Sequence, residues 1–435
     1  MTKQQMDPMR RKQARHAQKA KLKRRRRQST LLVTAVILAV AAAVGWFFLG
    51  GKEPGETRPI ETAPPETVPA ETQAPRPQTG TTVIHIAAAG DLNVTDYVLE
   101  NAAHENGYDF SETFLDVAPI LSSADLTLLN FEGNLSGERY GYATGAAPLE
   151  LPKALKAIGV DAVQTANSAA IRQGVSGLVT TLERFEIVGM TTLGTYADTE
   201  DFRQRGGYEI VEVEGMRIAL IAFTKGMDNL GLPAGSENCV NILYEDYSSN
   251  YKKVDTNAIA KVLRNVAEEQ PDLTIAMVHW GSEYNEEISN SQEKIRKQLQ
   301  EGGVDIILGT HPHLLQKVDY DAIGKTLVAW SLGDFFGDAV MAGTGYSVIL
   351  DLEITRDNAT GEVYLSGWDF VPIYTLKPEQ SVSGGHRVVR IREAMERYEQ
   401  NFVGRITDDA YKSMEKALSK IEDKLVPKTE EQQSQ

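Results

Sequence analysis

The sequence places five potential metal ligands at the ends of apolar runs. Asp91 follows TVIHIAAAG and Glu132 follows LTLLNF, while His279 ends LTIAMVH, and His311 and His313 come just after VDIILG. In open α/β sheets, ligands bind beyond the carboxyl ends of the strands, so we expect these side chains at one edge of a sheet. Carboxylate oxygen and neutral imidazole suit Mn, Fe and Zn. The set therefore predicts a site for a divalent metal.

This prediction depends on the coincidence of the five positions. A single Asp or His at a strand end more often caps the next helix or ends a turn. Here, however, three of the seven histidines of the chain fall at such positions together with two carboxylates. That combination is what a hydrolytic centre with one or two metals requires. The remaining histidines, His16, His85, His104 and His386, are expected to have no ligand role.

The elements that must position these residues alternate between strands and helices. Buried strands are expected at 82–90, 125–131, 160–166, 217–223, 273–280 and 304–309. Helices are expected at 111–124, 176–185, 256–270 and 290–303, with two more at about 387–401 and 407–424. The segments 326–333, 346–354 and 362–373 alternate apolar and polar residues as antiparallel strands do. The pattern predicts an α/β domain whose sheet is covered by helices on both faces.

The first 81 residues differ from the rest in composition. Residues 1–30 form a basic tail, and residues 31–50, LLVTAVILAVAAAVGWFFLG, contain no charge and are long enough to span a bilayer. The positive-inside rule puts the basic tail in the cytoplasm and the main domain outside the cell. A cleaved signal peptide is the rival interpretation, but its charged and apolar regions would both be unusually long. Residues 51–81, rich in Pro, Glu and Thr, predict a disordered linker.

The distribution of charge and the cysteine content further limit the class of protein that this sequence can encode. Residues 1–29 hold twelve of the 45 basic residues and one of the 60 acidic ones, which leaves 33 basic against 59 acidic residues in the remainder. The arginine run beside a membrane span is expected to set topology, and no nucleic-acid partner is expected. Cys239 is the only cysteine, so the exported domain must depend on its own core without an internal disulfide. We place that domain at 82–402 and a C-terminal helical tail at 403–435.

Five short motifs carry a resemblance to a known family. AAAGDLNV, LLNFEGNLSG, VHWGSEY, GTHPHLLQ and WSLGDFF occur in the order and approximate spacing found in CapA-type capsule biosynthesis proteins. Those proteins, also called poly-γ-glutamate synthesis proteins, resemble calcineurin-like metallophosphoesterases. The resemblance covers roughly residues 82–375 and implies a four-layer αββα sandwich. It also implies that the five residues named above occupy the family's metal-site positions.

The third motif of the family is altered in this chain. The family pattern A-N-N-H-x-x-D-x-G is represented by ANSAAIRQG at 166–174. Ser168 stands in place of an asparagine ligand, Ala169 in place of a histidine thought to protonate the leaving group, and Arg172 in place of an aspartate. Alanine transfers no proton, and general acid catalysis typically contributes a factor of about 10²–10⁴ in rate. The resemblance leaves Asn167 and Arg172 as candidate substrate-binding residues.

Two of the altered positions allow more than one interpretation. Arg172 could oppose a cation, hold a phosphate or carboxylate, or be a solvated residue near a helix start. Asp334, where the family usually has asparagine, could supply a replacement carboxylate or only end its strand.

The resulting hypothesis is a single-pass, membrane-anchored, extracytoplasmic CapA-like protein with little or no hydrolysis. It would assist synthesis, export or attachment of a capsule polymer, poly-γ-glutamate or polysaccharide, and its partners would be the membrane, the polymer or the synthase and export subunits. The alternative is an active metal-dependent hydrolase of a phosphoester or amide, so the sequence leaves open whether the chain is an enzyme. A third class is a display module for adhesion or signalling. The acidic exterior disfavours direct contact with an anionic polymer, because like charges repel.

Overall fold

The computed structural model describes residues 80–382, 384–401 and 406–426. The predicted basic tail, the predicted membrane span and nearly all of the predicted linker lie outside these residues. Within them, no helix combines the length and the apolar character that crossing a bilayer requires.

The larger sheet contains β1 (Thr81–Asn93), β4 (Leu126–Glu132), β5 (Ala162–Gln164), β6 (Thr191–Leu193), β13 (Asp334–Phe336), β14 (Tyr346–Asp357), β15 (Val363–Leu376) and β16 (Arg387–Arg390). Its strand order is β16-β15-β14-β1-β4-β5-β6, and β13 pairs with β1 beside this path. From β1 to β6 the neighbours are parallel, whereas β14, β15 and β16 are added antiparallel. The carboxyl ends of β1, β4 and β5 therefore meet at one edge of this sheet.

The smaller sheet contains β7 (Glu209–Val213), β8 (Met216–Thr224), β9 (Leu273–His279), β10 (Ile306–Thr310), β11 (Val318–Asp321) and β12 (Thr326–Ala329). The order is β11-β12-β10-β9-β8-β7. The four central strands are parallel, and the two edge strands are antiparallel to their neighbours. β9 is buried at every residue, as expected for a parallel strand covered on both faces. A separate two-stranded hairpin joins β2 (Ala103–His104) and β3 (Gly107–Tyr108).

The helices are α2 (Asp96–Ala102), α3 (Ala118–Ser123), α4 (Glu150–Ala157), α5 (Gly174–Val188), α6 (Thr199–Arg205), α7 (Thr256–Glu269), α8 (Asn290–Glu301), α9 (Ile391–Glu399) and α10 (Asp408–Leu425), with a 3₁₀ turn at Pro378–Gln380. Local capping explains several boundaries. The side chain of Asp255 accepts from Ala258 N at the start of α7, and Ser289 and Gln292 form a reciprocal capping box at the start of α8.

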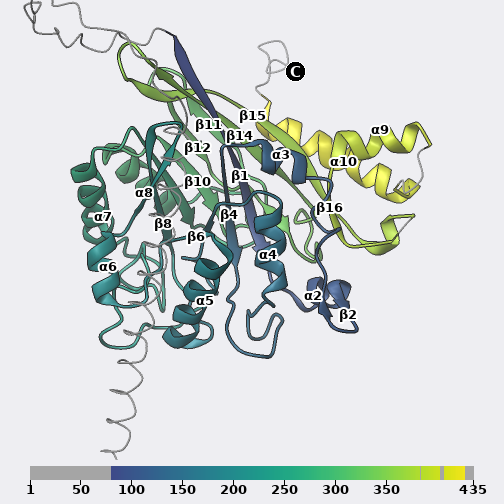
Figure 1. Ribbon diagram of the computed structural model, residues 1–435, viewed down its shortest axis with the longest axis horizontal. Helices are drawn as coiled ribbons and strands as arrows, with labels where there is room; N and C mark the ends of the chain where they lie inside the picture. Colours follow the sequence, from purple (N-terminus) through teal and green to yellow (C-terminus); the bar gives the residue numbers. More distant parts are fainter. Residues whose placement is uncertain (1–79, 383, 402–405, 427–435) are drawn as a thin grey trace, which may run out of the picture. The chain divides into compact units, whose positions relative to one another are not determined.

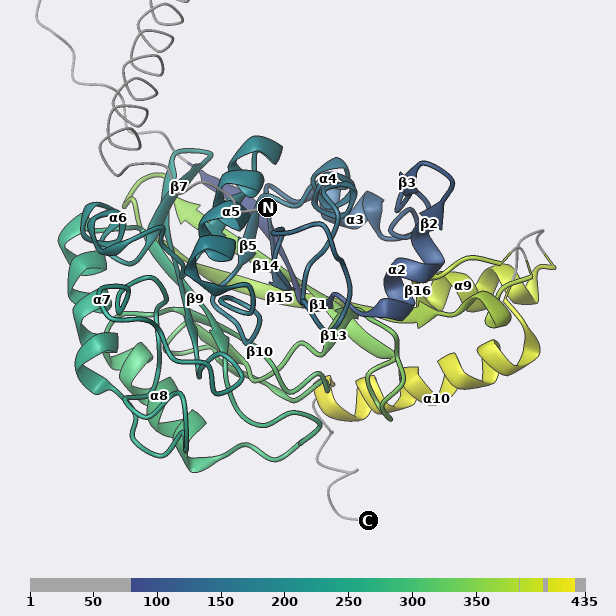
Figure 2. The same ribbon diagram turned by 90° about the horizontal axis from the view of Figure 1, so that it is seen from below.

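The two sheets and the helices that cover them form layers (Figures 1 and 2). Three apolar cores separate these layers. The central core joins the facing surfaces of the two sheets, for example Ile86 and Leu128 with Leu220 and Ile275. A second core lies between the larger sheet and α2, α3, α4 and α5, and a third lies between the smaller sheet and α6, α7 and α8. The domain is therefore an α/β sandwich with two sheets face to face between helical layers.

The last helix belongs to the same central core. The larger sheet extends beyond the smaller one at β14 and β15, and α10 packs there. Buried Met414 and Ile421 of α10 join the cluster that includes Leu350 and Leu365. The C-terminal helical segment, which we had set apart from the domain, thus covers part of the sheet.

Two local predictions are wrong. The segment expected to be helical at 111–124 is helical only from Ala118, and the residues before it form turns. Residues 387–390, expected to open a helix, form strand β16 against β15. In both cases the apolar residues that suggested a helix are buried by tertiary packing, with Phe114 and Val388 in the same core.

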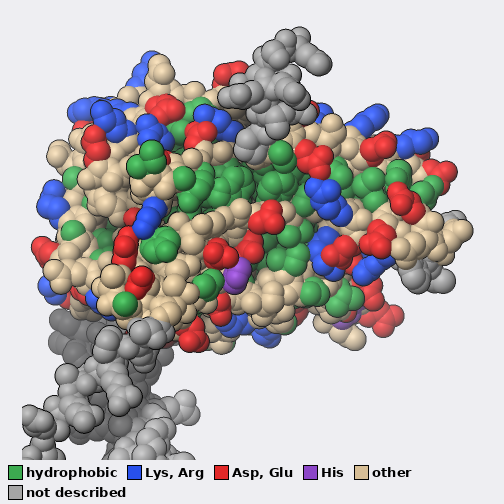
Figure 3. All heavy atoms as spheres, turned by 90° about the horizontal axis from the view of Figure 1, so that it is seen from above, with side chains coloured by type: hydrophobic (Ala, Val, Ile, Leu, Met, Phe, Trp, Pro, Cys, Tyr) green, Lys and Arg blue, Asp and Glu red, His purple; other side chains and the backbone are tan. Residues whose placement is uncertain are grey.

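One face of the molecule shows charges of both signs. Figure 3 shows acidic and basic side chains interspersed around a band of hydrophobic side chains. On this face the acidic excess of the chain does not form a continuous patch.

Candidate metal centre

Asp91 is held where β1 and β13 approach each other closely. A Cβ atom on Gly90 would lie 1.8 Å from the carbonyl oxygen of Gly333, so glycine is required at this position. The next residue, Asp91, donates its N–H to the same carbonyl oxygen at 2.9 Å. The Asp91 side chain is fully buried. The close contact therefore fixes the point at which this carboxylate leaves the sheet.

A chain of buried amides orients the Asp91 carboxylate. Asn130 donates from Nδ2 to Asp91 Oδ1 at 2.6 Å, and the backbone N–H of His311 donates to Oδ2 at 3.0 Å. Asn167 donates from Nδ2 to Asn130 Oδ1 at 2.9 Å and to the carbonyl oxygen of Phe131 at 2.7 Å. Asn167, predicted to bind substrate, is fully buried and lies behind the carboxylate that it helps to orient.

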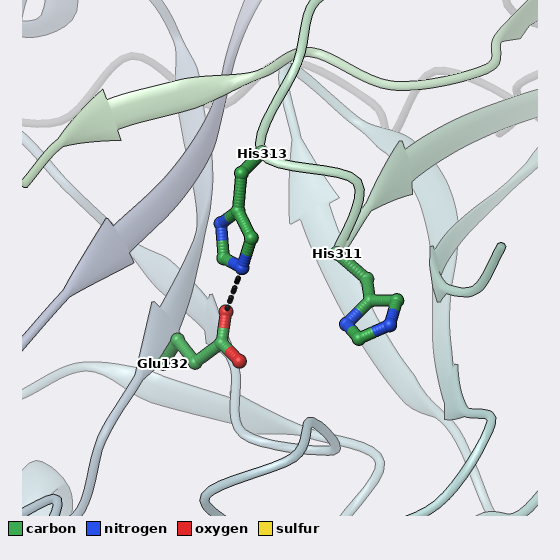
Figure 4. Close-up of side chains that lie close together, drawn as sticks. All are labelled: Glu132, His311 and His313. Carbon is green, nitrogen blue, oxygen red and sulfur yellow. Dashed lines mark ion pairs between the residues drawn. The ribbon is translucent and has the colours of Figure 1, made fainter. Parts of the chain in front are cut away.

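The histidines come from neighbouring strands of the smaller sheet. His279 ends β9, and β10 pairs with it so that Thr310 lies opposite His279. The turn after β10 places both His311 (φ 91°) and His313 (φ 59°) in the left-handed region. Such backbone conformations are uncommon outside glycine and cluster at functional sites. They bring the two rings to the face where β4 delivers Glu132 (Figure 4).

The five predicted residues form one cluster. Glu132 Oε1 lies 3.6 Å from His279 Nε2, and Glu132 Oε2 lies 4.0 Å from His313 Nε2 (Figure 4). His313 Nδ1 lies 3.7 Å from Asp91 Oδ2. Among the described residues, three combinations place their ligand atoms within 4.8 Å of one another: Glu132, His311 and His313; Asp91, Glu132 and His279; and Asp91, His313 and Asp334.

Two buried atoms of this cluster lack a hydrogen-bond partner. They are His311 Nδ1 and Glu132 Oε2. Buried polar atoms are nearly always paired in folded proteins, so orphaned atoms facing a ligand cluster call for a partner. Nitrogen and carboxylate oxygen donors at these separations fit a divalent transition metal. The residues present therefore fit the metal that the sequence predicts.

Burial sets the protonation states of the cluster. Burial raises the pKa of Asp91 to about 6 and that of Glu132 to about 7, although the charge of His313 opposes both shifts. Burial also lowers the pKa of His279 and that of His311 well below the usual value. These two rings are therefore neutral at pH 7 and have a nitrogen lone pair available for a cation.

Asp334, for which the sequence left open a replacement carboxylate or the end of a strand, belongs to the cluster. Its Oδ1 lies 2.8 Å from His313 Nδ1, and its side chain is almost fully buried. Burial lowers the pKa of His313, but Asp334, Glu132 and Asp91 together raise that pKa well above its usual value. In the sequence, the only indication of this role was an aspartate where the family usually has asparagine. The pairing of β13 with β1 explains the role, because it places Asp334 opposite Asp91.

The altered third motif lies beside the cluster. The Ser168 hydroxyl donates to Glu132 Oε1, and its Oγ lies 3.4 Å from His279 Nε2. Ala169 is buried, with 1% of its surface exposed, so no side chain there reaches a ligand. Arg172 forms an ion pair with Asp228 and donates from Nη1 to the carbonyl oxygen of Tyr142 at 3.1 Å.

A cavity of about 250 Å³ opens next to these residues. It is lined by the ligand candidates Glu132, His313 and Asp334, by Ser168, and by Arg172 with its partner Asp228. Five carboxylates lie on its walls, because Glu283 and Asp338 line it as well. A ligand in this cavity would contact the metal cluster on one side and Arg172 on another.

Two facing sheets with carboxylates and histidines at their strand ends define an α/β sandwich protein with a candidate metal centre. Residues 85–339 match the family described as bacterial capsule synthesis protein PGA_cap, and the chain belongs to this family. It is 26% identical over 284 residues to the PGA biosynthesis protein CapA of Bacillus subtilis (strain 168), covering 64% of this chain and 70% of that protein. It is 28% identical over 312 residues to the capsule biosynthesis protein CapA of Bacillus anthracis, covering 69% and 71% respectively.

The solved structures to which this chain is similar are more distant in sequence. A phosphatase from Mycoplasma pneumoniae is 15% identical, with a TM-score of 0.41, and the match covers 68% of this chain and 95% of the phosphatase. The calcineurin-like phosphoesterase YfkN from Bacillus subtilis is 15% identical, with a TM-score of 0.38, and the match covers 67% and 91%.

Proposed function

We propose that this protein is a membrane-anchored, extracytoplasmic component of capsule assembly that binds an anionic capsule polymer with weak or no hydrolysis. Poly-γ-glutamate is the first candidate polymer, and a polysaccharide is the second. The partners would be the membrane, the polymer and the subunits that synthesise or export it. Family membership supports the capsule role, and the uncharged segment at 31–50 supports the anchor.

The observation that carries this proposal is the convergence of the five predicted ligands beside an incomplete third motif. Asp91, Glu132 and the three histidines fall, together with Asp334, into three overlapping groups of three whose ligand atoms lie within 4.8 Å of one another. Ala169 provides no proton donor, and Arg172 is paired with Asp228 instead of contributing a carboxylate to the cluster. The chain thus keeps the means to hold a cation and lacks the side chain expected to protonate a leaving group.

A cation would also resolve a conflict of charge. The cavity walls carry five carboxylates, which repel a polymer of glutamate residues. A divalent ion at the cluster would offset part of that charge and, as a Lewis acid, would attract a carboxylate or phosphoryl oxygen. The residues of the chain would orient that oxygen, and Arg172 would offer a second contact on the cavity wall.

The first experiment measures the metal content of the full chain, purified in detergent, by mass spectrometry after dialysis against a weak chelator. We expect about one or two equivalents of Mn, Fe or Zn. An Asp91→Ala/His311→Ala variant should lose the metal, whereas a His85→Ala variant should keep it, because His85 lies outside the cluster and pairs with Asp351. A folded protein without metal would contradict the cation-dependent part of the proposal.

The second experiment tests hydrolysis by the metal-loaded protein. We expect no more than slow cleavage of a phosphoester or a γ-glutamyl amide. Cleavage at an ordinary enzymatic rate, abolished by Asp91→Ala or His311→Ala, would replace the proposal with the alternative of an active metal-dependent hydrolase. The observation that favours this alternative is the cavity beside the cluster, which gives a substrate access to Glu132 and His313.

Restoring the third motif separates the two functions directly. In an active hydrolase, the double substitution Ser168→Asn/Ala169→His should raise the rate, because it returns a ligand and a proton donor. Since Ala169 is buried, the unfolding temperature and the metal content must be measured on the same preparation. No gain in a folded, metal-loaded variant would count against the hydrolase and for the binding protein.

A further inference from the structure

We infer that Arg172 forms an oxyanion-binding position beside the metal cluster, and that the side chain of Asp228 occupies this position when no ligand is bound. The inference rests on the proposed function, because it assigns the second contact of a bound anionic polymer. It adds a specific internal competitor, the Asp228 carboxylate, which any incoming carboxylate must displace.

Arg172 is fixed in place by the loop that carries Tyr142. Its Nη1 donates to the carbonyl oxygen of Tyr142 at 3.1 Å, and its Cζ atom lies 5.7 Å from the centre of the Tyr142 ring. A Cβ on Gly145 would lie 3.1 Å from Arg172 Cδ, so the stem of the arginine also packs closely. A guanidinium has five N–H donors, and a planar fork held in this way is suited to a two-point bond with a carboxylate or phosphate.

Asp228 is presented to Arg172 by a tight turn. Leu230 N donates to the carbonyl oxygen of Met227 at 2.7 Å, and both central residues, Asp228 and Asn229, are left-handed, with φ of 48° and 62°. The turn is anchored because Met227 is fully buried. The Asp228 side chain, in contrast, is 44% exposed. A change of its rotamer, without movement of the turn, is therefore enough to free Arg172.

The ion pair is suited to exchange. Ion pairs with a solvent-exposed partner contribute little to stability, so the Arg172–Asp228 contact is a weak barrier to an anion that binds the fork with two oxygens. Both residues line the same cavity as Glu132 and His313. A polymer with repeated carboxylates could place one carboxylate at the cation and another on Arg172. The ligand class is thus a multivalent oxyanion, of which γ-linked glutamate is the member that fits the family.

The test is a double-mutant cycle on the full chain in detergent, loaded with Mn²⁺ and titrated calorimetrically. Two probes are used separately: a γ-linked glutamate oligomer and inorganic phosphate. Asp228→Asn should tighten binding about two- to five-fold, because the internal carboxylate no longer competes. Arg172→Gln should weaken binding, and Asp228→Asn should give no gain in the Arg172→Gln background. Asp338→Asn is the matched control, since it removes one charge from the same cavity wall and leaves the Arg172–Asp228 ion pair unchanged.

The outcomes separate this inference from the proposed function. An oligomer that binds equally well to the wild type, Arg172→Gln and Asp228→Asn would overturn the Arg172 position and leave the proposed function standing. Phosphate binding that follows the cycle, with no binding of the oligomer, would support the position and contradict the γ-glutamate ligand. An equal gain in Asp338→Asn would show a general effect of charge and overturn the inference. No binding of either probe to Asp228→Asn would overturn it as well.

Discussion

At His313 the two ring nitrogens face different carboxylates. Nδ1 lies 2.8 Å from Asp334, and Nε2 faces Glu132 Oε2 at 4.0 Å. An ionised carboxylate only accepts hydrogen bonds, so Asp334 holds the proton on Nδ1 and leaves Nε2 for a cation. Histidine ligands of metals commonly have such an outer carboxylate, which fixes the ring and raises its basicity. Asparagine at this position could accept the same bond without the negative charge.

We therefore expect Asp334→Asn to weaken metal binding about tenfold and Asp334→Ala up to about a hundredfold. The measurement is a competitive titration of the metal-free protein with Mn²⁺ or Zn²⁺ and a chromophoric chelator. Asp338→Asn, a carboxylate on the wall of the same cavity, serves as the control and should change the affinity little. Unchanged affinity in Asp334→Ala would show that Asp334 does not support the cluster.

Metal binding should also depend on pH in a predictable direction. With the pKa of Asp91 raised to about 6 and that of Glu132 to about 7, both mainly by burial, and with the pKa of His313 raised well above its usual value by the neighbouring carboxylates against the effect of burial, protons compete for these ligands in the metal-free protein. A cation binds the deprotonated forms, so the apparent affinity should fall as the pH is lowered through 7 and then 6, by about tenfold per unit for each proton displaced. Titrations at pH 8, 7 and 6 test this. A constant affinity over that range would contradict the assignment of both carboxylates as ligands.

The stability of the metal-free protein should change in the opposite direction. A carboxyl group whose folded pKa is raised binds more protons in the folded state than in the unfolded state between its two pKa values. Its contribution to stability is therefore lost as the pH rises from about 4 to about 7. Bound metal should remove this dependence of stability on pH, because the cation would occupy the carboxylates that otherwise bind protons.

At the scale of elements, the pairing of β1 with β13 brings two parts of the site together. Asp91 lies opposite Asp334 in this parallel pair, although the two residues are far apart in the sequence. The backbones can approach only because Gly90 has no side chain. The same contact lets Gly333 accept the hydrogen bond from Asp91. One glycine thus positions carboxylates from two strands.

Gly90→Ala should accordingly damage both folding and metal binding. The added methyl group overlaps the carbonyl oxygen of Gly333, and overpacking of this kind costs about 1–3 kcal/mol or more. The control is Gly367→Ala, which also lies in the larger sheet but has no neighbouring atom within 4 Å of the new Cβ. The free energy of unfolding in denaturant and the affinity for metal should be measured for both variants, and only Gly90→Ala should lose both. Equal behaviour of the two would mean that the β1–β13 contact does not determine the geometry.

At the scale of the whole described domain, stability depends on burying both faces of each sheet. α10 completes the cover where the larger sheet extends past the smaller one, and its buried residues join the central core. The final helix is therefore packed as part of the core of the domain.

Ile421→Ala should lower the free energy of unfolding by about 2–5 kcal/mol, because Ile421 is fully buried in the central core. Lys416→Ala on the exposed side of α10 is the matched control and should stay within about 0.5 kcal/mol of the wild type. Unfolding measured in urea provides the comparison. If Ile421→Ala were as stable as the control, α10 would be a loosely attached tail, as its position after the domain in the sequence suggested.

Sequence by itself determined the strands that carry the candidate ligands and the positions of those candidates at the strand ends. Apolar runs such as LTIAMVH are buried on both sides, and the polar residue at the end of each run lies at the carboxyl edge of the sheet, so local pattern is sufficient to place His279 or Glu132. The motif series also identified the family, and the linear order of ANSAAIRQG revealed the loss of the third motif.

Only the tertiary structure decided which residues act together. The contact between Asp334 and His313, the ion pair of Arg172 with Asp228, and the place of Asn167 behind Asp91 all join residues from different strands and loops. No local pattern contains such information, because it depends on strand order and on the close approach of backbones. The same limit explains the helix predicted at 111–117 and the strand missed at 387–390. There, packing against distant residues overrides the periodicity of the segment itself.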